Sequence, residues 1–529
     1  MNKTNLQKLG FPILFFLLGT LAAAYLHWPA LTNPTTYKSD VRQCPHWAAY
    51  HTTSFQDDDL LVQYGQFNES PIQNLLYYVG TFFVDMVLLT KLVAVIGYGL
   101  SALVFFLVGQ ALFGTRGGVL TGFFFTCCPD QFIYFAGGFS KMWIIPLLVV
   151  LVYILQQESW RYLIILMPFA ALAYPMTPVL MGITILVYVF LCLPTDPQKA
   201  GSVFYNLALG SAFALALLLM KYLFPSSEIG TMTPHARLLQ MPEMYRGGLC
   251  KYLPVPALHT ELLSHVMHPF TLGSAILFLL ILRKNIVWTR VWTALLLASI
   301  IGYVAADSLF MRLYIPNRYA RYSLPVLLIL WNARNWDLVL RKIPWKRGQY
   351  AMLVVLLLVA GFLYKDTFTQ GKDTINRVHL APLSQFLRTL PENILIAGHP
   401  RIMDDIPIQA KRSVLCNYKM AHPWFATYYD EIQERTYATF RAMYASDPKP
   451  LNELHQRYGV THFVVGKKYM ERVYTRKRIY VNPYEGYIRF LLQGKTTFFL
   501  NSPPREAVIY EDARYIVLTL PIEGEASEI

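Results

Sequence analysis

The sequence predicts a polytopic α-helical membrane protein that ends in a smaller α/β domain outside the membrane. Hydrophobic residues make up 55% of the 529 residues and charged residues only 15%, and the mean hydropathy is +0.35. A soluble domain could hardly hide so much apolar surface from water, whereas a chain that crosses a bilayer many times requires it. The apolar runs fill residues 1–366, and charged residues become frequent in residues 367–529. We therefore expect two domains with these bounds.

A helix crosses the hydrocarbon core with roughly 20 apolar residues, and about eleven runs of this kind are bounded by charge, glycine or proline. They are expected near residues 10–28, 91–113, 117–135, 139–157, 160–174, 176–194, 203–224, 268–283, 288–306, 322–338 and 349–365. The first run has no convincing small-residue cleavage site before Trp28, so it is expected to be a membrane span. Residues 72–113 are too long for one span, and we expect Asp85 and Lys91 to divide them into an interfacial helix over 72–90 and a span over 91–113.

The net charge of +14 indicates membrane topology and not nucleic-acid binding, because the basic residues gather in alternate loops between apolar runs. With the N-terminus in the cytoplasm, four segments fall on the outer face. These are the opening loop 29–90, the loop 225–267, the segment 307–321 and everything after residue 366. The predicted location is the bacterial cytoplasmic (inner) membrane, with the C-terminal domain extracytoplasmic.

The C-terminal domain is predicted from a change of pattern. Short β-rich runs at 393–398, 461–466 and 514–520 alternate with helical patterns at 424–446 and 450–458. Such alternation over about 160 residues is typical of one α/β domain.

The opening loop contains the first candidate site residue. Asp40 comes directly after the first span and two positions before Arg42, where a base that acts on a lipid-borne substrate would have to lie. Asp57, Asp58 and Asp59 follow in the same loop, and they either support the site or cap a helix that begins near Leu60.

Three arginines on the outer face break the usual charge rule. Arg312, Arg318 and Arg321 lie between two spans, where positive charge is normally sparse. Arg318 and Arg321 are three apart and share a helix face, and guanidinium groups match phosphate oxygens in a bidentate way. They predict a phosphate site at the outer leaflet, and the alternative is that they anchor the chain among lipid headgroups.

Other polar residues on the outer face are weaker candidates. Arg246, a further predicted donor-phosphate ligand, and His235 are expected to line a polar cleft in the loop 225–267, where Gly247 and Gly248 permit close backbone approach. Asp130 and Lys141 flank an outer turn and have supporting roles in this prediction, or are simply polar helix ends. Together the candidates present a base and a phosphate clamp at the depth of a polyprenyl-phosphate headgroup, and a direct displacement with one base would invert the anomeric carbon.

Five segments resemble those of bacterial proteins similar to the GT-C superfamily of integral-membrane glycosyltransferases. They are "SDVRQ" (39–43), "MPEMYRGG" (241–248), "IPNRYARYSLP" (315–325), "AHPWFATYY" (421–429) and "YGVTHFVVG" (458–466). The resemblance implies a GT-C-like transmembrane domain, with Asp40 as the catalytic base and Arg318 and Arg321 as donor-phosphate ligands. Many members use a further carboxylate in the next outer loop, sometimes with a divalent metal, and only Asp130 stands there, so dependence on Mg or Mn is left open.

The predicted function is that of a membrane hexosyl- or pentosyltransferase. It would move a sugar from a polyprenyl-phosphate donor to a glycan, lipid or protein acceptor of the cell envelope. One alternative is a transporter or flippase of lipid-linked oligosaccharides, which would require polar residues deep within several spans. Another is a non-catalytic scaffold in envelope assembly.

Overall fold

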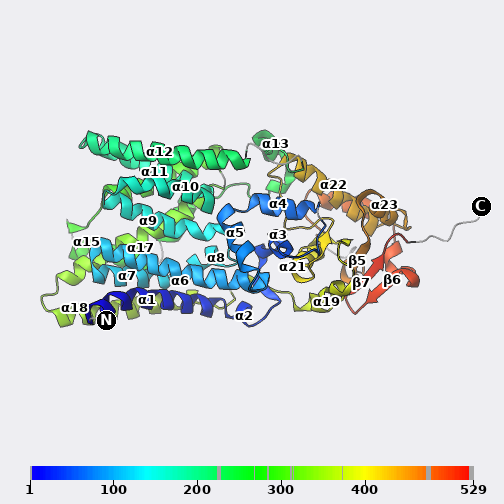
Figure 1. Ribbon diagram of the computed structural model, residues 1–529, viewed down its shortest axis with the longest axis horizontal. Helices are drawn as coiled ribbons and strands as arrows, with labels where there is room; N and C mark the ends of the chain where they lie inside the picture. The colour runs from blue at the N-terminus through cyan, green and yellow to red at the C-terminus, as the bar shows by residue number, and fades with distance from the viewer. Residues whose placement is uncertain are drawn as a thin grey trace, which may run out of the picture.

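The computed structural model describes residues 3–56, 58–222, 228–266, 269–282, 285–309, 312–313, 315–371, 373–471 and 478–522. A bundle of long helices forms one half of the molecule, and a smaller part with a five-stranded sheet forms the other (Figure 1). The helices α3 (Pro45–Ala49), α4 (Leu60–Asn68) and α5 (Pro71–Gly80) lie between the two halves.

The helices of the bundle follow the predicted apolar runs. They are α1 (Lys3–Leu26), α6 (Met86–Phe113), α7 (Thr115–Thr126), α9 (Ile144–Gln156), α10 (Leu163–Ala173), α11 (Met176–Cys192), α12 (Pro197–Tyr222), α15 (Pro269–Ile281), α16 (Arg290–Ser308), α17 (Asn317–Arg341) and α18 (Lys346–Tyr364). Within the described residues, α6, α12, α16 and α18 are long and apolar enough to cross a membrane, and five further apolar helices are shorter. The number of spans stays a prediction.

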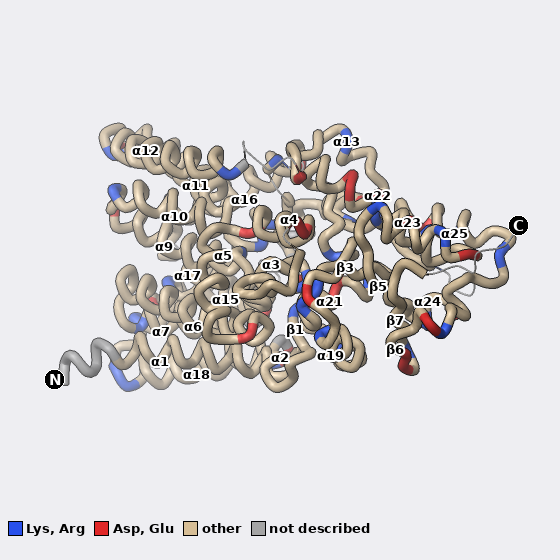
Figure 2. The backbone as a smooth tube through the Cα atoms, turned by 45° about the vertical axis from the view of Figure 1, so that its right-hand side comes forward, with Lys and Arg blue, Asp and Glu red and all other residues tan. Residues whose placement is uncertain are grey.

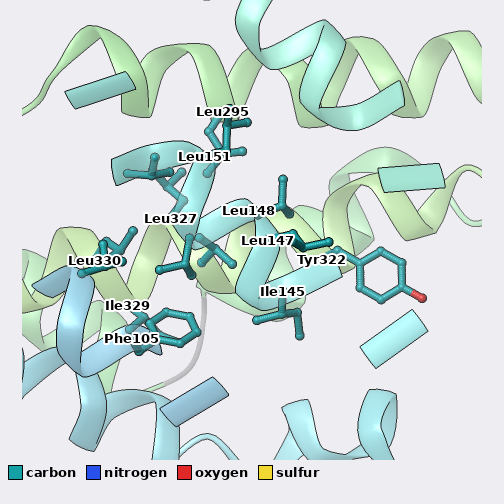
Figure 3. Close-up of a cluster of buried hydrophobic side chains, with 14 of the residues drawn as sticks. Phe105, Ile145, Leu147, Leu148, Leu151, Leu295, Tyr322, Leu327, Ile329 and Leu330 are labelled. Carbon is teal, nitrogen blue, oxygen red and sulfur yellow. The ribbon is translucent and has the colours of Figure 1, made fainter. Parts of the chain in front are cut away.

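The helix α17 forms the centre of the bundle although its own sequence is the least apolar of the long helices. Its side chains Tyr322, Leu327 and Leu330 are buried against neighbouring helices, among them α9 with Leu148 and α16 with Leu295 (Figure 3). Burial of one leucine or isoleucine side chain contributes about 1.5–3 kcal/mol, so packing determines the position of this helix.

Residues 72–113 form two helices as predicted, but the boundary between them lies earlier in the chain than residue 90. The helix α5 ends at Gly80, and α6 begins at Met86 because the carboxylate of Asp85 accepts a hydrogen bond from the amide of Val87. Lys91 therefore lies inside α6, where its ammonium donates to a backbone carbonyl of the opening loop. Residues 72–90 therefore do not form one interfacial helix. They comprise most of α5, a turn and the first residues of α6.

The predicted run 117–135 is likewise interrupted. The helix α7 ends at Thr126 and the short helix α8 (Phe132–Phe135) begins after a 3-10 turn at Pro129–Gln131. Proline has no amide hydrogen with which to continue a helical hydrogen-bond ladder, so the chain turns there.

Glycines of α1 and α6 allow close contact between these two helices. Gly19 of α1 and Gly99 of α6 face each other, and a Cβ atom on Gly19 would lie 3.0 Å from the Cα of Gly99. Small residues of this kind let two membrane helices approach closely.

The C-terminal part contains a mixed sheet with the strand order β4-β3-β5-β7-β6. Its strands are β3 (Leu395–Gly398), β4 (Ser413–Val414), β5 (His462–Gly466), β6 (Val508–Glu511) and β7 (Tyr515–Thr519). The strand β3 is parallel to β4 and β5, whereas β7 is antiparallel to β5 and β6. Three strands and the helices α22 (Ala426–Met443) and α23 (Lys449–Tyr458) lie where the sequence predicts them.

Candidate functional site

Asp40 lies at the junction of the two halves of the molecule. It belongs to a short 3-10 helix (Ser39–Gln43) that follows the strand β1 (Thr36–Lys38). The strand β1 pairs in antiparallel with β2 (Thr374–Asn376), at the start of the C-terminal part. Figure 2 shows β1 between the helical bundle and the sheet, with basic residues (blue) close to it. The loop after α1 is thereby fixed to a segment far away in the sequence.

Two lysines from distant parts of the chain hold the carboxylate of Asp40. The Nζ atom of Lys419, from the segment before α22, is 3.0 Å from Oδ1. The Nζ atom of Lys141, from the 3-10 helix Ser140–Trp143 before α9, is 3.7 Å from Oδ2. Asp40 is 31% exposed and both lysines are less exposed. The carboxylate is therefore accessible from outside while its partners are mostly covered.

These lysines keep Asp40 ionised. Burial raises the pKa of Asp40, but the positive charges of Lys141, Lys419 and Lys38 outweigh this effect and hold the pKa well below its ordinary value of 3.8. At neutral pH the group is a carboxylate, which can accept a proton or a hydrogen bond but cannot donate one.

Lys38 brings a third ammonium group to the site. It is 4% exposed and forms an ion pair with Asp373. Burial and the positive charge of Lys141 lower the pKa of Lys38 to about 7, although Asp40 acts in the opposite direction. An additional anion beside Lys38 would raise this pKa again, so binding of an anion and full protonation of Lys38 favour each other.

Arg318 belongs to the same electrostatic neighbourhood. It lies in the first turn of α17, where its Nη1 donates a hydrogen bond of 3.3 Å to the hydroxyl of Tyr322. Its positive charge acts on both Lys38 and Lys141. We refer to Asp40, Lys38, Lys141, Lys419 and Arg318 as the Asp40 cluster. The cluster has four cationic side chains and one carboxylate, so it favours the binding of an anion.

Arg42 attaches the 3-10 helix of Asp40 to the C-terminal part. Its Nη2 donates to the hydroxyl of Ser39 at 2.8 Å, and its Nη1 lies 3.0 Å from Asp404 and 3.5 Å from Asp405. Both aspartates are 1% exposed. Arg42 therefore positions Asp40 through the backbone and does not need to touch a substrate.

Asp404 also positions Lys419. One oxygen of Asp404 binds Arg42, and the other accepts a 2.7 Å hydrogen bond from the backbone amide of Lys419. Burial raises the pKa of Asp404 to about 7, and the nearby Arg42 counteracts this. A single buried side chain thus fixes the segments that carry Asp40 and its nearest lysine.

The other predicted phosphate ligands lie around the cluster or on the surface. Arg321 is half-buried on α17, three residues after Arg318. Arg312 and Arg246 are exposed, and among the described residues no ion pair joins either of them to Asp40.

The predicted supporting residues have varied positions. Asp59 is buried and accepts hydrogen bonds from the amides at 61 and 62, which confirms a cap for the helix that begins at Leu60. Asp58 and Asp130 are exposed, and His235 is half-buried at the start of α13 (His235–Gln240). Asp57 lies outside the described residues.

The sequence prediction did not single out Lys38 and Lys419. Lys38 stands two positions before Asp40, so its position in the segment "YKSD" is a signal that sequence reasoning could have used. Lys419 is separated from Asp40 by 379 positions. Nothing local in the sequence connects it with the opening loop.

The residues around Asp40 do not fit a divalent cation. Magnesium and manganese prefer oxygen ligands, whereas the nearest groups to this carboxylate are ammonium groups that repel a cation. Within the part of the chain that the structure describes, no three His, Cys, Asp or Glu side chains form a group that could hold a metal ion.

Comparison with known proteins bears on the fold. No family model and no curated protein matches the chain. The solved oligosaccharyltransferase of Archaeoglobus fulgidus, in a complex with Zn and sulfate, is similar over 87% of this chain and 69% of its own, with 13% sequence identity and a TM-score of 0.51. ArnT from Cupriavidus metallidurans bound to undecaprenyl phosphate matches 96% of this chain and 98% of its own, with 12% identity and a TM-score of 0.45.

The comparison with the oligosaccharyltransferase shows a shared fold. The similarity to the oligosaccharyltransferase covers 87% of this chain, and that enzyme belongs to the GT-C superfamily. The predicted GT-C-like architecture is therefore confirmed at the level of the fold. Because the sequence identity is low, the reaction itself has to be argued from the site.

Proposed function

We propose that the chain is a glycosyltransferase that takes a sugar from a polyprenyl-phosphate donor and gives it to an acceptor of the cell envelope. The reaction would take place at the outer face of the bacterial cytoplasmic membrane. The observation that carries the proposal is the Asp40 cluster, an ionised carboxylate among four cationic side chains at the end of an apolar helical bundle. The GT-C-like fold supports it.

The cationic side chains suit the phosphate of the donor. When the bond between the anomeric carbon and the phosphate oxygen breaks, negative charge accumulates on the departing phosphate. Ammonium and guanidinium groups placed beforehand stabilise that charge more strongly in a partly dry site than in water. Lys38, Lys141, Lys419 and Arg318 have this role in the proposal, and Arg321, one turn further along α17, is a proposed additional ligand.

Asp40 has the role of the base. It would accept the proton of an acceptor hydroxyl whose oxygen attacks the anomeric carbon from the side opposite to the phosphate, so that the configuration inverts. In the ligand-free site, the lysines make Asp40 a weak base. A bound phosphate would draw those lysines toward itself and raise the pKa of Asp40, so donor binding would activate the base.

The charge distribution along α17 supports the proposed orientation. Arg318 lies at one end of this helix, and Arg341 lies at the other. At that second end Arg116, Arg334 and Arg341 surround the buried carboxylate of Asp337. An excess of basic residues at the cytoplasmic boundary is typical of membrane proteins, which supports the proposed position of the Asp40 cluster on the outer face.

Asp40→Asn tests the proposed reaction directly. The change keeps the shape of the side chain but removes its ability to take up a proton, so transfer should fall by about 10²–10⁴-fold. We suggest expression of the wild type and the variant in a host that lacks the native gene, with mass spectrometry of the envelope glycans as the readout. Asp366→Asn, at an exposed position near the end of α18, is the matched control. Full transfer by Asp40→Asn would exclude Asp40 as the base.

A further inference from the structure

A second polar site lies beside the Asp40 cluster. A pocket of about 630 Å³ is lined by α4, the start of α5, the end of α12 and the residues Glu228 and Ile229. Its polar lining residues are Gln63, Gln66, Glu69, Asn74, Lys221 and Glu228. The pocket therefore lies at the predicted outer boundary of the membrane, where α12 ends.

Two glutamines give the pocket its hydrogen-bonding capacity. The side-chain amides of Gln63 and Gln66 make no hydrogen bond to another residue that the structure describes. Asn74, by contrast, is fixed, because its amide donates to the carbonyl of Gln66 at 2.9 Å and its oxygen lies 3.0 Å from His46. A rigid wall thus carries two amides that can each donate and accept hydrogen bonds.

The charges of the pocket do not suit a phosphate. It contains the carboxyl groups of Glu69 and Glu228 and one cation, Lys221. The Nζ atom of Lys221 donates to the backbone carbonyl of Glu69 at 2.5 Å and lies over the ring of Phe67. Two acidic groups against one lysine favour a neutral or cationic ligand.

Glu69 connects the pocket with the Asp40 cluster. It is buried, and the charge of Lys141 acts on Glu69 as it does on Asp40. Burial raises the pKa of Glu69, while hydrogen bonds from Ser140 and the amide of Ser70 act in the opposite direction. The pocket and the proposed base are therefore both close to Lys141.

We propose that this pocket binds the carbohydrate of the acceptor. Sugar hydroxyl groups act as donors and acceptors at once, so amide side chains can pair with them in both ways and carboxylate groups can accept from them. The charge of the pocket favours a neutral sugar or an amino sugar, and leaves the phosphate of the donor to the Asp40 cluster. This inference rests on the proposed function, and it narrows the acceptor from a glycan, lipid or protein to one that presents a sugar.

The test measures sugar binding and not transfer. We suggest saturation-transfer NMR with the full-length protein in detergent, and a set of probes that consists of glucose, galactose, mannose, N-acetylglucosamine and glucosamine. At least one sugar should receive saturation from the wild type and from Asp40→Asn. The signal should be lost in Gln63→Leu and Gln66→Leu, and kept in Gln157→Leu, which changes an exposed glutamine after α9. Unchanged unfolding temperatures would show that the variants are folded.

Three results would overturn the assignment. They are the absence of signal from every sugar, an equal signal from the Gln63→Leu and Gln66→Leu variants, and loss of the signal when polyprenyl phosphate is added. The last result would mean that the pocket belongs to the donor. Failure of transfer in Asp40→Asn with sugar binding intact concerns the proposed reaction alone, so the two proposals can fail separately.

Discussion

Asp40 is surrounded by cations that reach it from three different parts of the chain. Lys38 is a neighbour in the sequence, Lys141 comes from the bundle and Lys419 comes from the C-terminal part. A carboxylate in such surroundings is ionised at every physiological pH. The same cations are available to an incoming phosphate, so base and phosphate site share their partners.

Replacement of Lys419 by methionine should weaken the binding of polyprenyl phosphate. Methionine keeps the length and apolar stem of the side chain but removes one charge-assisted contact, which is worth about 1.5–3 kcal/mol, or roughly 10–100-fold in affinity. Isothermal titration calorimetry of the detergent-solubilised protein measures this. Lys449→Met, an exposed lysine of α23, is the control and should bind like the wild type. Equal affinity of Lys419→Met and the control would remove Lys419 from the phosphate site.

Because His46 is buried, we expect the free energy of unfolding to depend on pH. It is 1% exposed, and burial lowers its pKa to about 3, although the hydrogen bond to Asn74 acts in the opposite direction. The folded protein therefore keeps His46 neutral, while the unfolded chain takes up a proton below about pH 6.5. The free energy of unfolding should fall as the pH decreases from about 6.5 toward 3.

A comparison of unfolding temperatures at about pH 7.5 and about pH 5 tests this linkage. The decrease should be larger in the wild type than in His46→Gln, and His259→Gln, at an exposed position, should behave like the wild type. The same decrease in all three proteins would mean that His46 does not contribute.

At the scale of the elements, hydrophobic periodicity predicted the helices well and their interruptions poorly. Each apolar run contains a helix, because burial of its side chains drives the element to form. The ends depend on single side chains such as Asp85, whose cap moves the start of α6 ahead of the predicted position. The strands β3, β5 and β7 were predictable because each forms a β-rich run between charged segments, whereas β4 and β6 were not predicted.

Asp337, near the end of α17 opposite to Arg318, is expected to stabilise the fold. Asp337 is fully buried, 2.8 Å from Arg341 and 3.5 Å from Arg116. Removal of the carboxylate charge leaves these arginines uncompensated, but they are partly exposed, so the loss should be about 1–3 kcal/mol, less than for a fully buried pair. Asp337→Asn should therefore unfold at a lower temperature in a differential scanning measurement in detergent. Asp307→Asn, which is exposed, should not, and a wild-type unfolding temperature for Asp337→Asn would contradict this account.

At the scale of the whole molecule, the site exists only because the opening loop and the C-terminal part meet. The strand pair β1 and β2 and the ion pairs of Arg42 with Asp404 and Asp405 fasten the two together. Sequence reasoning placed Asp40, Lys141 and Arg318 on one face from the order of the spans. It could not find Lys419, because contacts between segments hundreds of residues apart leave no local pattern.

The C-terminal part thereby receives a role in the proposed reaction. It supplies Lys419 and, through Asp404, fixes the position of the segment that carries it. The position of the sheet beyond the bundle in Figure 1 is consistent with a cover over the end of the helices. We infer that this part completes the donor site and does not only shield it.

The most direct measurement is a cryo-electron microscopy structure of the full-length protein with polyprenyl phosphate. The account predicts density for the phosphate group within hydrogen-bonding distance of Lys141, Lys419 and Arg318, with the carboxylate of Asp40 facing it and the lipid tail leaving along the helical bundle. Phosphate density at the opposite end of the bundle, beside Arg116 and Arg341, would contradict the account.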